Sequence, residues 1–152
     1  MKNSNLKKSL LWVLVIAVVI GLTVTGELYG SRIDNTTPPT ETRTAEDITA
    51  EEAFTLIQAN QQNPEFVIID VRTLDEFAQG HIENAINIDY YSDTFSDETE
   101  ALDKNKTYLI YCRSGARSSQ ALALIAVQNF TKVYNISGGI NAWQAAGLPV
   151  LE

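Results

Sequence analysis

The sequence predicts an α/β domain with a central parallel sheet and helices on both faces, preceded by an N-terminal hydrophobic helix. Short apolar runs, typical of strands that are buried on both faces, alternate along the chain with segments of helical pattern. Strands and helices that alternate in this way form parallel sheets covered on both sides. An uncharged segment near the N-terminus lies outside this alternation and is therefore expected to be a separate element.

The composition allows one compact domain and argues against two classes of partner. The chain has 152 residues, of which 45% are hydrophobic, enough for a single core. From Ala45 onward, six Lys or Arg stand against sixteen Asp or Glu, and the net charge of the whole chain is −8. An acidic surface disfavours nucleic acid and anionic lipid as main partners. With one cysteine and one histidine, no internal disulfide, metal site or cofactor is expected.

Residues 1–29 are predicted to form a signal peptide or a membrane anchor. Three lysines precede an uncharged stretch at residues 10–25, which as a helix would span about 24 Å at ~1.5 Å per residue. We favour a retained single-pass anchor with the domain on the extracytoplasmic side, because the lysines stay in the cytoplasm. The alternative is cleavage after Gly26, a weak site, which would leave the domain periplasmic or secreted. The lysines and the terminal position disfavour a buried core helix.

The first half of the domain combines two predicted helices with two predicted strands. Residues 30–44, rich in Thr and Pro, are expected to be a linker, and residues 45–152 the domain. Capping-box patterns predict the helices, and continuous apolar runs predict the strands. The helices are expected at 48–60, from Thr49 and Glu52, and at 73–80, from Thr73 and Glu76, and the strands at 66–70 and 85–88.

The second half continues the alternation. Strands are predicted at residues 107–111 and 132–136, with a helical turn near residues 98–102 before the first of them. The helix expected at 118–130 is apolar almost all round, which predicts that it is covered on more than one side. A last short helix is expected within residues 138–150, after a turn at Gly138 and Gly139 and before Gly147 and Pro149.

Cys112 is the candidate nucleophile. It directly follows the strand predicted at 107–111, at the carboxyl edge of the sheet where ligands bind. The loop "CRSGAR" leads into a helix N-terminus, where unpaired backbone amides gather, and Gly115 lets those amides converge on an anion. The positive end of the helix dipole, together with Arg113 and Arg117 nearby, is expected to lower the pKa of the Cys112 thiol. A buried structural cysteine is the alternative, and the order of strand, loop and helix disfavours it.

Three stretches resemble the signature motifs of the rhodanese-like, single-domain sulfurtransferases. They are "VIIDVRTLDEFAQGHIENAINI", "YCRSGARS" and "GGINAWQAAGLPV", in the order of the family, and the resemblance covers roughly residues 45–152. It implies the rhodanese-like three-layer fold and a persulfide carried by Cys112. The residues that it implies as the substrate cradle are Arg113, Ser114, Gly115, Ala116 and Arg117.

The reaction expected from this resemblance moves a sulfane sulfur through a Cys112 persulfide. The donor would be a small anion such as thiosulfate and the acceptor a thiol or cyanide, with a protein thiol as a further candidate partner. Ping-pong kinetics follow from such a double displacement. A slow sulfur-relay or docking module of the same fold is the alternative, and the intact cysteine loop argues against a purely structural interaction domain.

The loop length separates this chemistry from phosphate chemistry. Cysteine phosphatases and related arsenate reductases use a C-x5-R loop, which holds a tetrahedral oxyanion. Arg117 lies five positions after Cys112, which makes this loop C-x4-R. The smaller ring resembles the sulfurtransferase loop and leaves less room for phosphate.

Other polar residues lie near the same sheet edge. Asp70 and Arg72 follow a predicted strand, so they are expected to line the pocket or support the loop. We favour a structural role, in which Asp70 caps backbone amides and Arg72 pairs with Glu76 or another acid. Tyr90, with its neighbour Tyr91, is expected at the pocket rim or exposed on a loop. The remaining conspicuous side chains, expected in the scaffold, are those of His81 and Trp143.

Overall fold

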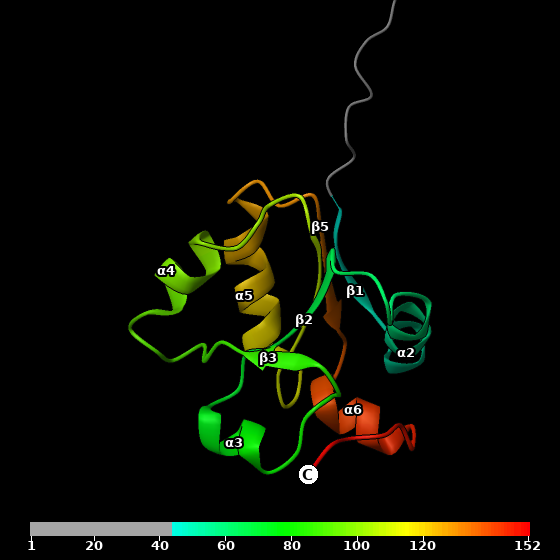
Figure 1. The fold of residues 1–152 in the computed structure, drawn as a ribbon. Helices are drawn as coiled ribbons and strands as arrows, with labels where there is room; N and C mark the ends of the chain where they lie inside the picture. Colours follow the sequence, from blue (N-terminus) through cyan, green and yellow to red (C-terminus); the bar gives the residue numbers. More distant parts are fainter. Residues whose placement is uncertain (1–43) are drawn as a thin grey trace, which may run out of the picture. The chain divides into compact units, whose positions relative to one another are not determined.

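A five-stranded parallel sheet forms the centre of the domain (Figure 1). The computed structural model describes residues 44–152. In the order β1-β5-β4-β2-β3, the strands are β1 (Thr44–Ile48), β5 (Lys132–Ile136), β4 (Thr107–Tyr111), β2 (Phe66–Asp70) and β3 (Ala85–Asn87). The helices are α2 (Ala50–Ala59), α3 (Leu74–Ala78), α4 (Phe95–Glu100), α5 (Ala116–Ala126) and α6 (Gly139–Ala145). The predicted α/β class is thus confirmed.

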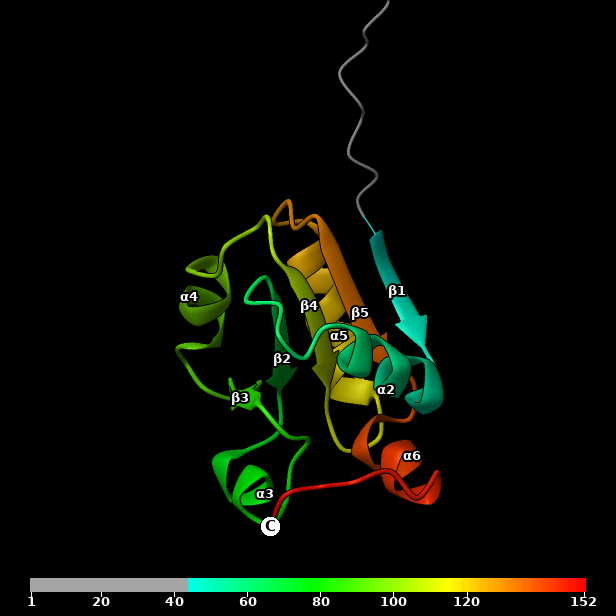
Figure 2. The same ribbon diagram turned by 45° about the vertical axis from the view of Figure 1, so that its right-hand side comes forward.

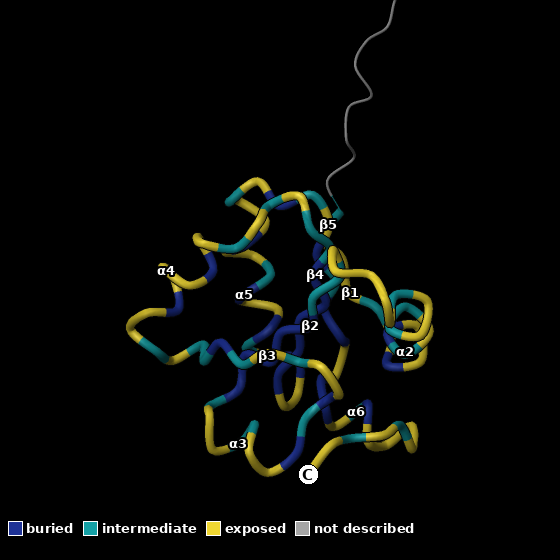
Figure 3. Tube along the Cα trace, in the orientation of Figure 1, coloured by how far each residue is buried: buried dark blue, intermediate teal, exposed yellow. Residues whose placement is uncertain are grey.

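The two faces of the sheet bury separate hydrophobic clusters. On β4, Ile110 packs in the cluster that includes Ile125 of α5, whereas Leu109 packs with Ala53 of α2 and Trp143 of α6. Figure 1 shows α4 and α5 on one side of the sheet and α2 on the other, and Figure 2 shows α2 in front of β4 and β5. In Figure 3 the buried colour runs through the central strands. Successive side chains of β4 therefore point into opposite cores, as its apolar sequence predicts.

Both capping boxes are present. The Glu52 amide donates to the Thr49 hydroxyl at 3.2 Å, and the Thr49 amide donates back to the Glu52 carboxylate at 2.8 Å. Thr73 and Glu76 make the same reciprocal pair at the start of α3. These bonds satisfy amides that the first helical turn leaves free, which explains why these two helix starts were predictable from sequence.

The edge strand β1 was not predicted. It includes Thr44, which we assigned to the linker, and Ile48, which we assigned to the first helix. β1 pairs in parallel with β5, with Thr44 opposite Lys132, and its three central side chains are exposed. The backbone ladder to β5 holds most of this strand, and only Ile48 at its end packs against the hydrophobic core. Its sequence, TAEDI, therefore carries no hydrophobic pattern.

The helix after the cysteine loop differs from its prediction in two respects. α5 begins at Ala116, two residues before the expected start at Ser118. The expectation of burial on more than one side is wrong, since Leu124 is 49% exposed and Val127 is 79% exposed. Only the face that carries Ser118, Ala121 and Ile125 is buried. The outer apolar residues are an ordinary part of a protein surface.

The predicted anchor, residues 1–29, lies outside the described part of the chain. Within residues 44–152, no helix is both long and apolar enough to cross a membrane.

Candidate active site

The Cys112 sulfur is enclosed where β4 ends. Cys112 is the first residue after β4 and is only 1% exposed. Three loop residues then lead to Ala116, the first residue of α5. In this loop Gly115 has φ +91°, in the left-handed region, which turns the backbone back over the cysteine. A reacting atom must therefore enter the ring of the loop to reach the sulfur.

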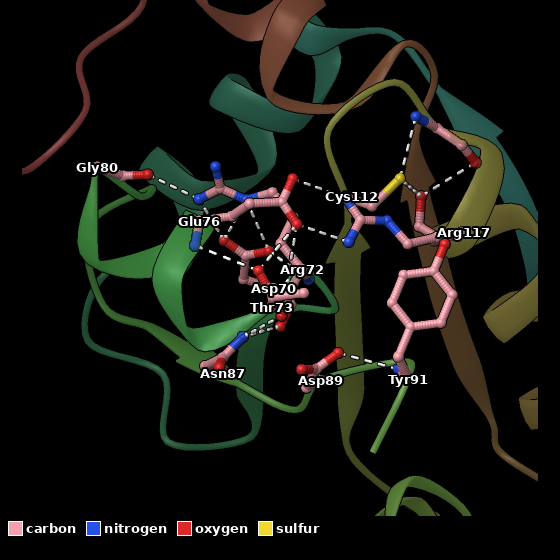
Figure 4. A network of polar contacts seen from close by, with 12 residues as sticks. Asp70, Arg72, Thr73, Glu76, Gly80, Asn87, Asp89, Tyr91, Cys112 and Arg117 are labelled. Carbon is pink, nitrogen blue, oxygen red and sulfur yellow. Dashed lines mark hydrogen bonds and ion pairs between the residues drawn. The ribbon is translucent and has the colours of Figure 1, made fainter.

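Hydrogen-bond donors surround the sulfur (Figure 4). The Gly115 amide donates to Sγ at 3.2 Å, and the Ser118 hydroxyl, which is fully buried, lies 3.5 Å from it. Burial raises the pKa of the Cys112 thiol, but hydrogen bonds from Ser118 and from the amides of Ser114 and Arg117 outweigh it and lower the pKa overall. The arrangement favours a thiolate.

The backbone rather than the arginine side chains forms this cradle. Arg113, Ser114 and Ala116 are exposed, and Arg113 forms no ion pair within residues 44–152. Of the predicted loop residues, Ser114, Gly115 and Arg117 bring their backbone amides to the sulfur. A ring of amides holds negative charge without a bound cation.

Arg117, one of the residues implied for the substrate cradle, is held in an ion pair. Its guanidinium donates two hydrogen bonds to Glu76 of α3, at 2.7 and 2.8 Å. Pairing with Arg117 lowers the pKa of Glu76 to about 2, and the same carboxylate raises the pKa of Arg117. The Tyr91 ring lies 5.5 Å from the guanidinium, and Tyr91 is 68% exposed. The Arg117 guanidinium thus links the cysteine loop to α3 and to the segment that carries Tyr91.

Asp70 and Arg72 form a buried pair with each other, so Arg72 does not pair with Glu76. The shortest bond of the pair is 2.6 Å, and Arg72 also donates to the Gly80 carbonyl at 2.6 Å. Asp70 accepts the Arg72 amide at 2.9 Å, as the capping role predicted. Asn87, which no sequence pattern indicated, donates to the carbonyls of Asp70 and Arg72. This network joins β2 and β3 to the segments that precede and follow α3.

The other candidate side chains lie in or near the scaffold. Tyr90 is half-buried, and its hydroxyl donates to Gln120 of α5 at 3.0 Å. His81 stacks on Phe77 with ring centroids 3.9 Å apart. Trp143 is buried and donates to a backbone carbonyl, so the scaffold role expected for His81 and Trp143 matches their contacts.

The start of α6 docks on the back of the cysteine loop, which sequence reasoning missed. The Ile140 amide donates to the Cys112 carbonyl at 2.8 Å, and the Asn141 amide donates to the Arg113 carbonyl at 3.1 Å. Gly139 allows this approach, because a Cβ there would lie 2.3 Å from the Cys112 carbonyl oxygen. The sequence feature that could have indicated this contact is the double glycine, Gly138 and Gly139, which we assigned only to a turn.

Replacing Ser118 by alanine is expected to raise the pKa of the Cys112 thiol, because the thiolate loses a buried hydroxyl donor while the burial remains. Thiolate formation should move to higher pH, and below the midpoint the thiolate fraction should fall about tenfold. The ultraviolet absorbance of the thiolate, followed against pH with a Cys112→Ser blank, measures the change.

The neighbouring variant Ser119→Ala is the matched control. The Ser119 hydroxyl accepts from Asn135 and has no bond to the sulfur. In Ser119→Ala, the midpoint of thiolate formation at Cys112 should stay at the wild-type pH. Equal midpoints for all three proteins would contradict the role of Ser118.

The chain is similar in sequence and in fold to known proteins. The chain is 36% identical over 96 residues to a protein named sulfurtransferase from Allochromatium vinosum, covering 63% of this chain and 88% of the relative. It is 34% identical to a tRNA uridine(34) hydroxylase from Photorhabdus laumondii, over 61% of this chain but only 29% of that enzyme. A crystal structure of a rhodanese-related protein from Thermoplasma volcanium superimposes with a TM-score of 0.61 at 27% identity, covering 70% of this chain and 97% of that one.

The family model described as the rhodanese-like domain matches residues 53–146, which is more than half of the chain. That stretch contains β2 to α6 and the whole cysteine loop. By this match and by its fold, the chain belongs to the rhodanese-like domain family.

Proposed function

We propose that this protein is a sulfurtransferase that carries a sulfane sulfur as a persulfide on Cys112. The family and the relative named sulfurtransferase support sulfur transfer at the level of the family. The observation that carries the finer proposal is the enclosed Cys112 sulfur, which faces the Gly115 amide and the Ser118 hydroxyl. The same donors can stabilise a thiolate before transfer and the terminal sulfur of a persulfide after it.

The chemistry is a double displacement. The Cys112 thiolate attacks the outer sulfur of thiosulfate, the S–S bond of the donor breaks with its electron pair on the leaving group, and sulfite departs. The enzyme then holds Cys112–S–S⁻. A thiolate or cyanide acceptor attacks the terminal sulfur of this persulfide, takes it as R–S–S⁻ or thiocyanate, and restores the Cys112 thiolate. No external oxidant or reductant is consumed, and ping-pong kinetics follow.

The access to the sulfur favours this reaction over phosphate chemistry. Cys112 is 1% exposed, and the loop closes over it within a C-x4-R spacing. A single terminal sulfur atom is narrower than a tetrahedral phosphoryl group. The enclosed ring therefore supports sulfur transfer.

The deciding experiment compares the full wild-type chain with Cys112→Ser. Thiosulfate-to-cyanide transfer is measured as thiocyanate, and the intact mass is recorded after treatment with donor alone. We expect multiple turnovers and a gain of one sulfur in the wild type, both lost in the variant, because Cys112 is the only cysteine.

Two other outcomes would change this conclusion. A stable mass gain without turnover would support a relay module that passes sulfur to a protein thiol. Neither mass gain nor turnover, with thiosulfate or with an organic sulfane donor, would refute the proposed function.

A further inference from the structure

The cations around the loop are not equally available to a substrate. Arg72 is 6% exposed and bound to Asp70, and Arg117 is bound to Glu76 through both of its terminal nitrogens. Arg113 is exposed and without an ion pair within the described residues. Of the three arginines in the two motifs, only Arg113 can offer uncompensated positive charge.

The carboxylate that neutralises Arg117 is held in place by its own helix. Glu76 Oε2 accepts from the Thr73 amide at 3.2 Å and from the Thr73 hydroxyl at 3.1 Å, in addition to Arg117 at 2.7 Å. Figure 4 shows the Arg117 guanidinium turned toward Glu76. The side chains of Arg117 and Glu76 are only 14% and 26% exposed, so water screens the pair less than it would a surface pair. Glu76 is thus a fixed negative charge beside the loop.

We propose that Glu76 sets the charge class of the sulfur donor: by neutralising Arg117, it makes the site select organic sulfane donors of low charge, such as persulfides and thiosulfonates, over the thiosulfate dianion. This inference rests on the proposed function, because it concerns the donor for the same Cys112 persulfide. Glu76 acts through Arg117 and is a positioning and specificity residue rather than a catalytic one.

The charge balance at the sulfur supports this choice of donor. A dianion has to approach an anionic thiolate, and the domain from Ala45 onward carries six basic against sixteen acidic residues. Amide dipoles and one free arginine offset only part of that repulsion, whereas an unpaired Arg117 would add a full charge close to the reacting atoms. A monoanionic thiosulfonate meets about half of that repulsion, and the protonated form of a persulfide meets none.

The transfer from such a donor balances without a further reagent. The Cys112 thiolate attacks the outer sulfur of R–S–SH, the donor S–S bond breaks, and R–S⁻ leaves with the electron pair. Cys112–S–SH remains, with the proton still on the transferred sulfur. The loop amides then stabilise its ionised form.

The test compares two donors of similar chemistry and different charge. Thiosulfate carries two negative charges and methanethiosulfonate carries one, and each transfers its outer sulfur from a group that leaves as sulfite or methanesulfinate. The full chain is assayed for thiocyanate at fixed cyanide, and the kcat/KM ratio of thiosulfate to methanethiosulfonate is compared between variants. The ratio removes differences in folded fraction and in intrinsic donor reactivity.

The main variant is Glu76→Gln. The Gln side chain can still accept from the Thr73 amide in the capping box, but it removes the charge that neutralises Arg117. We expect the ratio to rise about tenfold, because the freed guanidinium attracts the dianion more than the monoanion. The double variant Glu76→Gln with Arg117→Gln removes both charges, and its ratio should return to within about threefold of wild type.

Each outcome decides the proposal. An unchanged ratio in Glu76→Gln, or a raised ratio that persists in the double variant, overturns it while leaving the sulfurtransferase assignment intact. Neither turnover nor a gain of one sulfur in the wild type, with either donor, instead refutes the proposed function, and this inference with it.

A wild-type measurement covers the case in which Glu76→Gln does not fold. Added salt should raise kcat/KM for thiosulfate, because it screens a net repulsion. A fall with salt would show that free cations attract the dianion and would overturn the proposal.

Discussion

Replacing Gly139 by alanine is expected to destabilise the domain by about 3 kcal/mol or more and to abolish sulfur transfer. Gly139 has φ +58°, and a Cβ there would lie 2.3 Å from the Cys112 carbonyl oxygen and 2.9 Å from two backbone atoms of Arg113. No flexible side chain is available to move, so the loop itself must shift. The bonds from Ile140 and Asn141 to the loop carbonyls would then break.

The control for Gly139→Ala is Gly147→Ala. Gly147 also has positive φ, +71°, but apart from Gly147 and its two chain neighbours no described residue has an atom within 4 Å of the position that its Cβ would occupy. The free energy of unfolding of Gly147→Ala should fall by only about 1–2 kcal/mol, the cost of a left-handed backbone at a residue with a Cβ, and the variant should keep its activity. Urea denaturation of both variants gives the two losses in unfolding free energy. Equal losses would mean that the close approach of α6 to the loop is unimportant.

The cysteine loop illustrates what the sequence could and could not predict about the site. The position of Cys112 after β4 follows from an apolar run and a helix start that are adjacent in the chain. The docking of α6 on that loop depends on a contact between segments more than twenty residues apart, and a double glycine indicates a turn equally well. Local patterns predict local structure, and packing decides which glycine is required.

The pairing of the charged residues could not be predicted for a related reason. The sequence left Arg72 with Glu76 or another acid as its partner and indicated no partner for Arg117. Only the tertiary arrangement places Glu76 beside Arg117 and leaves Asp70 to Arg72. The edge strand β1 was missed because the backbone ladder to β5 and a side-chain bond from Asn135 to Asp47 hold it, without an apolar side-chain pattern. The periodicity of apolar residues along the sequence indicates which side chains are buried. Ion pairs and an exposed edge strand do not depend on such burial, so this periodicity does not predict them.

Replacing Asp70 by asparagine is expected to cost about 3–5 kcal/mol of unfolding free energy, because it leaves the buried Arg72 guanidinium without its counter-charge. Asp70 is fully buried and accepts four hydrogen bonds from Arg72, three from the side chain and one from the backbone. Asparagine has nearly the same shape but turns one acceptor into a donor that faces the guanidinium. The start of α3, and with it Glu76, should lose its fixed position, so activity falls together with stability.

Two comparisons separate this effect from a general sensitivity to lost carboxylates. Glu65→Gln removes one partner of the exposed pair with Lys106, whose N–O distance is 3.8 Å, and should cost less than about 1 kcal/mol. Adding Arg72→Met to Asp70→Asn removes the stranded charge, so the double variant should be more stable than Asp70→Asn alone. Denaturation by urea measures all three. A double variant that is less stable than the single one would show that Arg72 stabilises the fold through its bond to Gly80 and its packing rather than through its charge pair.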